Sequence, residues 1–266
     1  YDNLATGRRE AVRWGPLEEG DLRDEGRLRA VFHRRRPAAV LHFAGLSLVP
    51  ESVEQPDRYR DVNVGGSLAL LEVMGEVPLV FSSTCSVYGD QGDERLHEGL
   101  PLAPSNPYAE TKAAVEEAIA ARPGVRSAVL RYFNAASLGL GRGLSALHDD
   151  RPHLLPRLLA AAEADRSFTL FGGDYDTPDG TCVRDYVHVA ELAEAHILAL
   201  LRLLSGAPSG TWNLGSGRGA SVREVVAAVR SATGRALPER LLPRRPGDPA
   251  RLVADPTRAA TELGWR

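Results

Sequence analysis

Tyr108 and Lys112 are the residues of this chain whose types and spacing most clearly suggest chemistry. Asn106 and Pro107 have the side chains expected for the N-cap and the first residue of a helix. Tyr108 and Lys112 then stand at positions i and i+4 and share one helix face. Because an ammonium group beside a phenol favours the phenolate, the pair predicts a general base that takes a proton from a sugar or alcohol hydroxyl.

A hydroxyl-rich segment before this helix could hold the same substrate oxygen. The apolar run 79–81 is followed by Ser82, Ser83 and Thr84, as expected for a buried strand that ends in polar residues. A Tyr-x-x-x-Lys string also occurs often by chance, and a surface tyrosine with a solvated lysine is then the usual explanation. The significance of the string therefore depends on the other motifs of the chain.

The composition excludes several classes of protein. The chain has 266 residues and a net charge of -3, which gives no electrostatic basis for binding nucleic acid. Its two cysteines, Cys85 and Cys182, lack the spacing of a metal site or a disulfide framework. No apolar run approaches the ~20 residues of a membrane span, and no signal peptide is visible. A soluble cytoplasmic enzyme with no metal, membrane or nucleic-acid partner is therefore expected.

Apolar strands alternate with helices along the chain, which is typical of an α/β fold with a doubly wound parallel sheet. Strands are expected at residues 40–43, 79–81 and 128–132, and helices at 67–73 and 113–121. Ser221 and Glu224 form a capping-box sequence, which predicts a helix from Val222 to a point near Gly234.

Longer strings run nearly from end to end and resemble the extended short-chain dehydrogenase/reductase family. Strings of the wider family are Phe81–Thr84 with Val87–Gly89, Pro107–Lys112 and Arg131–Asn134. Strings that are similar to the UDP-hexose 4-epimerases within it are Phe171–Tyr175, Asp179–Val189, Asn213–Gly215 and Arg244–Pro249.

The resemblance implies reversible C4 epimerisation of UDP-glucose and UDP-galactose with bound NAD. The sugar would be oxidised to a 4-ketone, turned over and reduced from its other face. Tyr108 would be the base, Lys112 would lower its pKa and hold the nicotinamide ribose, and Thr84 would bond the C4 oxygen. Bringing a tyrosine pKa from ~10 to ~7 takes about 4 kcal/mol of differential stabilisation, which Lys112 and the cationic nicotinamide could supply together.

The resemblance also implies the residues that hold NAD. Asp2 would accept hydrogen bonds from the adenosine ribose diol, which favours NAD over NADP. The other cofactor residues would be Asn3, Asp21, Leu22, Phe43, Ala44, Gly45 and Phe133, together with Thr84, Tyr108 and Lys112. Ser47 and Val62 stand where relatives can carry Lys and Asn, so some pyrophosphate and nicotinamide contacts would differ.

A second set of residues would anchor the UDP group. By resemblance, Arg184 and Arg245 would present guanidinium groups to the diphosphate, and Asp248 would accept from a ribose hydroxyl. Further substrate contacts would come from Asn134, His153, Leu154, Thr169, Leu170 and Phe171. Arg251 would lie at the gate of the sugar pocket, where its bulk predicts a preference for UDP-glucose and UDP-galactose over N-acetylhexosamines. His42 and His188 are expected to be structural.

Residues 1–133 are expected to form the NAD-binding domain and 134–266 mainly the substrate lobe, with the chain crossing back to the first domain. The family also implies a homodimer. A 4,6-dehydratase is an alternative, although dehydratases usually carry an Asp-Glu pair where Cys85 and Ser86 follow Thr84 here. A non-catalytic nucleotide-sugar binder is a second alternative.

The glycine-rich turn of the family would precede Asp2, and the family usually continues beyond Arg266. We therefore expect a chain without the first strand and most of the second strand of the sheet. Because the first strand is normally central, we predict that residues 1–266 alone aggregate, lack bound NAD and show no epimerase activity. Purification beside a chain extended at its N-terminus tests this. A soluble, cooperatively melting 266-residue protein that retains NAD would contradict it.

Overall fold

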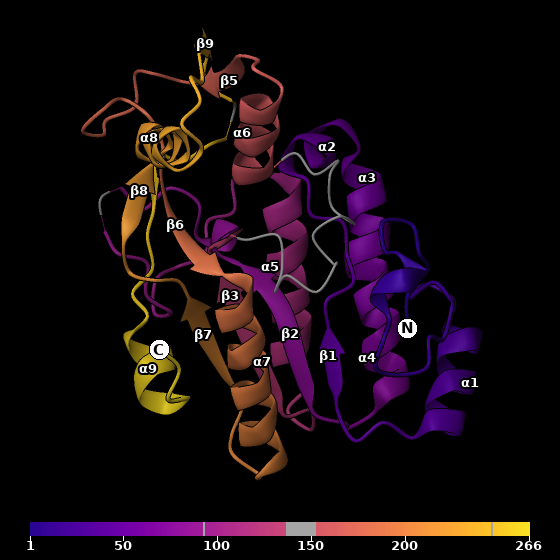
Figure 1. Ribbon diagram of the computed structural model, residues 1–266. Helices are drawn as coiled ribbons and strands as arrows, with labels where there is room; N and C mark the ends of the chain where they lie inside the picture. Colours follow the sequence, from indigo (N-terminus) through magenta and orange to yellow (C-terminus); the bar gives the residue numbers. More distant parts are fainter. Residues whose placement is uncertain (93, 137–152, 246) are drawn as a thin grey trace.

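A parallel four-stranded sheet forms the centre of the protein in the computed structural model (Figure 1). The structure describes residues 1–92, 94–136, 153–245 and 247–266. In spatial order its strands are β1 (Val40–His42), β2 (Leu79–Thr84), β3 (Ser127–Tyr132) and β7 (Gly210–Leu214). Thr84 is aligned with Tyr132, so β2 and β3 end side by side at the edge of the sheet where polar residues follow.

Helices cover both faces of this sheet, which confirms the predicted doubly wound α/β fold. One face carries α1 (Glu25–Arg35), α4 (Gly66–Met74) and α5 (Pro107–Ala120), and the other carries α7 (Val189–Leu204) and α9 (Thr257–Glu262). Successive residues of a strand point to opposite faces. Phe81 therefore packs in the cluster that contains α4 and α5, whereas Val80 packs in the cluster that contains α7.

A smaller group of elements lies above the sheet in Figure 1. It contains β4 (Asn134–Ala136), β6 (Val183–His188) and β10 (Arg251–Leu252), with β8 (Gly219–Ser221) antiparallel to β6. It also contains β5 (Phe168–Phe171) paired with β9 (Glu239–Leu242), and the helices α6 (Leu154–Glu163) and α8 (Val222–Thr233). In the sequence, β7 lies between β6 and β8 of this smaller group, but it pairs with β3 in the central sheet. The domain boundary at residue 133 stays a prediction.

Local signals position the two predicted helix starts. The Asn106 side chain accepts a hydrogen bond from the Ala109 N–H at 2.9 Å, and Pro107 is the first residue of α5. Ser221 and Glu224 bond reciprocally at the start of α8, which ends at Gly234 with a φ of 65°. Both predictions are confirmed.

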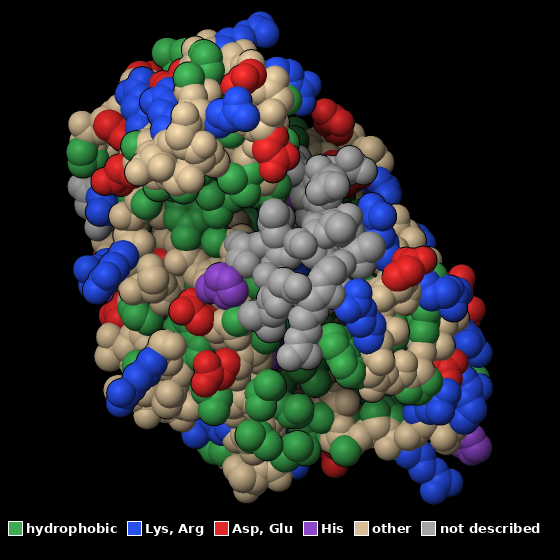
Figure 2. Space-filling model, in the orientation of Figure 1, with side chains coloured by type: hydrophobic (Ala, Val, Ile, Leu, Met, Phe, Trp, Pro, Cys, Tyr) green, Lys and Arg blue, Asp and Glu red, His purple; other side chains and the backbone are tan. Residues whose placement is uncertain are grey.

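Short helical segments connect the longer elements. They are η1 (Arg9–Ala11), α2 (Val49–Glu54), α3 (Pro56–Tyr59), the π-helical η2 (Arg60–Gly65) and the 3-10 segment η3 (Cys85–Tyr88). Figure 2 shows hydrophobic side chains gathered over the region that β1 and α7 occupy in Figure 1. Leu41 and Phe43 are 37% and 58% exposed there, and β1 has only β2 as a strand neighbour among the described residues.

Asp185 is a fully buried carboxylate that joins three parts of the chain. Its Oδ1 accepts hydrogen bonds from the backbone N–H and the hydroxyl of Ser216 at 2.7 and 2.6 Å. Its Oδ2 accepts from the N–H groups of Gly217 and Ala254 at 2.9 and 3.1 Å. The carboxylate therefore holds β6, the β7–β8 turn and the segment after β10 together.

We predict that Asp185→Ala lowers the free energy of unfolding by at least about 3 kcal/mol, because several buried donors lose their acceptor and each costs about 1–3 kcal/mol. Urea unfolding measures the change. The exposed Asp176→Ala, in a loop of the same lobe, is the control and should stay within about 0.5 kcal/mol of the parent. A loss of less than about 1 kcal/mol for Asp185→Ala would contradict the role.

Candidate active site

A cavity of about 720 Å³ lies between the end of the central sheet and the smaller group of elements. This volume lies within the usual range of small-molecule sites. Among the residues predicted from the sequence, the lining contains Thr84, Tyr108, Phe133, Asn134, His153, Leu154, Thr169, Leu170, Phe171, Arg184, Arg245 and Asp248. The fold thus brings the predicted base and the predicted UDP residues to one cavity.

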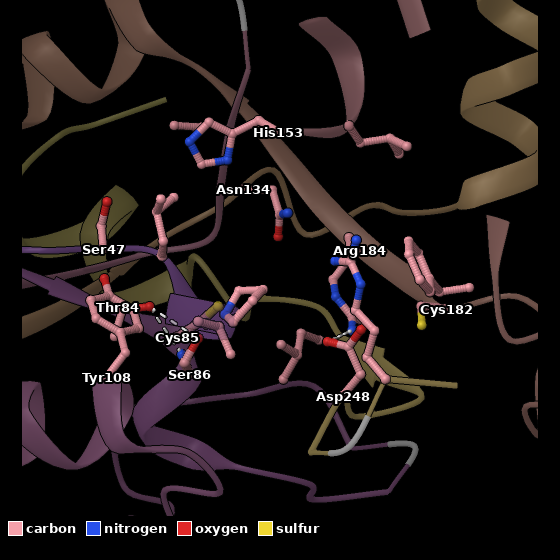
Figure 3. Close-up of a pocket in the computed structure, with 18 of the residues that line it drawn as sticks. Ser47, Thr84, Cys85, Ser86, Tyr108, Asn134, His153, Cys182, Arg184 and Asp248 are labelled. Atoms are coloured by element: carbon pink, nitrogen blue, oxygen red, sulfur yellow. Dashed lines mark hydrogen bonds and ion pairs between the residues drawn. The ribbon is translucent and has the colours of Figure 1, made fainter. Parts of the chain in front are cut away.

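Tyr108 and Thr84 lie together at one side of the cavity (Figure 3). Thr84 ends β2, and its Oγ1 accepts a hydrogen bond from the Ser86 N–H at 3.2 Å. Burial raises the pKa of Tyr108 to about 12, and a hydrogen bond with the Thr84 side chain lowers it only in part. In the protein alone, Tyr108 is therefore a protonated phenol at neutral pH.

Lys112 lies behind the cavity and does not line it. Its side chain is 6% exposed, its Nζ donates to the Ser82 carbonyl at 2.8 Å, and it lies 4.9 Å from the centre of the Phe81 ring. Burial lowers the pKa of Lys112 to about 8, against the opposing effect of Glu116. In the protein alone, desolvation of the phenolate outweighs the hydrogen bond with Thr84, and the lowering of the Tyr108 pKa by Lys112 together with the oxidised nicotinamide stays a prediction.

The opposite side of the cavity carries the two predicted guanidinium groups. Arg184 on β6 lies with Asp248 in Figure 3, at 3.4 Å between Nη2 and Oδ1. Arg245 stacks on the Phe171 ring, with its guanidinium carbon 4.0 Å from the ring centre. Asn134 and His153 lie between this side and the Tyr108 side.

The remaining predicted cofactor residues lie outside this cavity. They are Asp2, Asn3, Asp21, Leu22, Phe43, Ala44, Gly45 and Lys112. The structure brings part of this set together, since Asn3 Nδ2 donates to Asp21 Oδ2 at 2.9 Å. Asp2 is exposed and pairs with Glu19 in a parallel bridge.

Gly45 provides a test of whether these residues fit a dinucleotide. Its φ is +150°, and a Cβ there would lie 3.0 Å from Asn63 Oδ1 and 3.7 Å from Lys112 Nζ. Glycine therefore lets the backbone after β1 pass close to Asn63 and the buried ammonium, where a side chain would be crowded. With the exposed carboxylate of Asp2 as an acceptor for a ribose diol, the donor set fits NAD.

Asn63 is a positioning residue that the sequence did not reveal. Its Oδ1 accepts from the Leu46 N–H at 2.7 Å, and its Nδ2 donates to Thr111 Oγ1 at 3.0 Å. It therefore holds the loop after β1 against α5, the helix that carries Tyr108 and Lys112. Asn63 lies in the π-helical segment, a rare geometry that is frequent at functional sites and has no simple sequence signal.

Cys182, Tyr186 and Leu252 also line the cavity and were not predicted. Alternation along β6 could have indicated the first two, since Cys182, Arg184 and Tyr186 are spaced to face one side. Arg251 is not among the lining residues, whereas Leu252 is. Neighbours on strand β10 face opposite sides, so Leu252 is a second candidate for the gate, and the role of Arg251 stays a prediction.

The two histidines expected to be structural do not line the cavity. His42 is buried against the Ser67 hydroxyl at 2.8 Å, and burial lowers its pKa to about 3. His188 Nδ1 accepts from the Ala190 N–H at the start of α7. The described residues contain no cluster that could hold a metal ion, and none of their helices is long and apolar enough to cross a membrane.

Comparisons with known proteins agree with this geometry. The model of the NAD dependent epimerase/dehydratase family matches residues 2–215. The chain is 44% identical to a UDP-glucose 4-epimerase of Rhizobium leguminosarum bv. trifolii, over 100% of this chain and 83% of the relative.

Two solved structures share the fold over nearly the whole chain. The UDP-glucose 4-epimerase of Brucella ovis in complex with NAD has a TM-score of 0.91 and 43% identity, covering 100% of this chain and 84% of that one. The UDP-glucose 4-epimerase of Bifidobacterium longum with NAD+ and UDP has a TM-score of 0.83 and 36% identity, covering 97% and 80%. The chain therefore belongs to the NAD dependent epimerase/dehydratase family.

Proposed function

We propose that the full-length protein carrying this chain catalyses the reversible C4 epimerisation of UDP-glucose and UDP-galactose with bound NAD. The relatives and neighbouring structures are UDP-glucose 4-epimerases, and those from Brucella ovis and Bifidobacterium longum contain NAD. One observation carries the proposal. A single cavity joins a phenol and a hydroxyl on one side to two guanidinium groups and a carboxylate on the other.

The two sides of the cavity have different tasks. Arg184 and Arg245 hold the diphosphate, and Asp248 accepts a hydrogen bond from the uridine ribose. Thr169, Leu170 and Phe171 on β5 hold the uridine together with His153 and Leu154, and Asn134 contacts the phosphates. Because this anchor is remote from Tyr108, the sugar can turn over without release of the nucleotide.

At the reacting end, Tyr108 takes the proton of the C4 hydroxyl and returns it when the sugar is reduced from its other face. Thr84 hydrogen-bonds the same oxygen and keeps it within reach of the phenol. Bound NAD supplies the reversible acceptor for the C4 hydride, held by Asp2, Asn3, Asp21, Leu22, Phe43–Gly45 and Phe133. Lys112, whose ammonium group donates to the Ser82 carbonyl, would also hold the nicotinamide ribose.

The raised pKa of Tyr108 adds a condition to this mechanism. Burial raises the pKa of Tyr108 to about 12, so the phenol is protonated at neutral pH. A positive charge beside the phenol is therefore needed before Tyr108 can act as a base. The Lys112 ammonium and the oxidised nicotinamide are the two sources of that charge. We also propose, on the family resemblance alone, that the protein is cytoplasmic and forms a homodimer.

We predict that Tyr108→Phe lowers turnover at least ~100-fold, because removal of a general base typically costs that much. Conversion of UDP-galactose to UDP-glucose by the NAD-loaded enzyme measures turnover, and calorimetry measures UDP affinity. UDP affinity should change less than about twofold, because the anchor is remote from the phenol. Turnover within about tenfold of the parent would remove Tyr108 from its role.

Leu252 offers a test of substrate size. It lines the cavity, belongs to the buried cluster that contains Cys85 and Phe133, and is aligned with Arg184 where β10 pairs with β6. We predict that Leu252→Ala raises the kcat/KM of the N-acetylated UDP-sugars, relative to the unacetylated pair, by about tenfold or more. Arg251→Ala is the matched control and should leave this ratio within about twofold. A larger change for Arg251 than for Leu252 would support Arg251 as the gate.

A further inference from the structure

Lys112 is the only lysine of the sequence, and every other residue in the Lys and Arg count is an arginine. Exposed cations of this chain are thus arginines, and its one ammonium side chain is buried in the catalytic helix. Burial favours the neutral amine of such a group, and only an opposite charge or strong acceptors offset that preference. Ser82 supplies one carbonyl acceptor. The proposed function needs an ammonium ion, so a source of negative charge is required.

Glu116 lies one helical turn after Lys112 on the same face of α5 and is 8% exposed. Its side chain is fixed from two neighbouring strands. Arg131 on β3 donates Nε to both carboxylate oxygens at 3.1 Å and Nη2 to Oε2 at 2.5 Å. The Ser83 hydroxyl on β2 donates to Oε1.

The partners of Glu116 are themselves tied to the residues around Thr84. Arg131 Nη1 donates to the Tyr88 hydroxyl at 2.9 Å, and that hydroxyl donates to Asn213 Oδ1 at 2.8 Å. Ser83 immediately precedes Thr84, and Tyr88 ends the segment that follows it. The carboxylate is therefore a member of a buried network that spans α5, β2, β3 and β7.

We propose that Glu116 is a positioning residue whose carboxylate, held by Arg131 and Ser83, keeps Lys112 in its ammonium form at the Ser82 carbonyl. The proposal rests on the proposed function only for what the ammonium then does to Tyr108 and NAD. The notion that Glu116 serves packing alone makes a different prediction, since packing does not depend on the charge of the carboxylate.

The groups around Lys112 leave Glu116 as the source of negative charge. From β1, His42 faces it as a neutral imidazole, because burial lowers the His42 pKa to about 3. From β2 come the Ser82 carbonyl and the Phe81 ring. On α5, Tyr108 lies one turn before Lys112 and Glu116 one turn after it. The pKa of Lys112 is lowered to about 8 by burial, and Glu116 is the group that raises it. Without that carboxylate the ammonium would be lost at lower pH.

The test uses the fact that a lysine label in this chain reports on one side chain. Protein carrying 13Cε-lysine is titrated by NMR without NAD, so the readout does not depend on epimerase activity. We expect a midpoint near pH 8 in the parent and a midpoint lower by about one unit or more in Glu116→Gln. In this variant the unpaired Arg131 charge acts in the same direction. Glu117→Gln, the exposed neighbour, is the matched control and should leave the midpoint unchanged.

A Glu116→Gln midpoint equal to that of the parent would overturn the proposal, even if the variant melts at a lower temperature. If Glu116→Gln does not fold, Glu116→Gln with Arg131→Met removes both charges of the pair and is titrated instead, and an unchanged midpoint again overturns it. The alkaline limb of the kcat profile should move with the midpoint in the NAD-loaded enzyme. Absence of epimerase activity in the N-terminally extended protein would contradict the proposed function and leave the titration result standing.

Discussion

Burial of the Tyr108–Lys112 pair at the end of β2 is the constraint on which the rest of the site depends. Desolvation favours the neutral form of both groups, since it raises the pKa of the phenol to about 12 and lowers that of the amine to about 8. Base catalysis needs the opposite pair of charge states, a phenolate beside an ammonium. Much of the surrounding structure acts against this preference, through Thr84 at the phenol and through the Ser82 carbonyl and Glu116 at the amine.

The fold separates the buried Tyr108–Lys112 pair from the arginines that are proposed to bind the substrate. Tyr108, Thr84 and Lys112 lie where two central strands end, on elements fixed by backbone pairing and by the buried Glu116–Arg131 network. The arginines of the anchor come from β6 and from the segment between β9 and β10. Separate anchoring permits a substrate to be held tightly while its sugar adopts two orientations. This is what inversion at a carbon without an acidic hydrogen demands.

Sequence reasoning succeeded where the signal is local. Asn106 and Pro107 begin α5 as predicted, and the Ser221–Glu224 capping box begins α8, because capping depends on residues within one turn. It failed where the outcome depends on how distant segments meet. Three such contacts join residues that are 15 to 48 positions apart in the sequence. They are the hydrogen bonds of Lys112 with the Ser82 carbonyl, of Arg131 with Glu116, and of Asn63 with Thr111. The raised pKa of Tyr108 in the protein alone could not be predicted from the sequence for the same reason, since burial is a tertiary property.

The most direct test is the pKa of Tyr108 itself, obtained from the difference in ultraviolet absorption between the parent and Tyr108→Phe across a pH titration. The protein alone should titrate this phenol with a midpoint near 12. With NAD bound the midpoint should fall by about three units or more, because positive charge beside a buried phenol favours the phenolate. The same midpoint with and without NAD, or a midpoint below about 9 in the protein alone, would contradict the account.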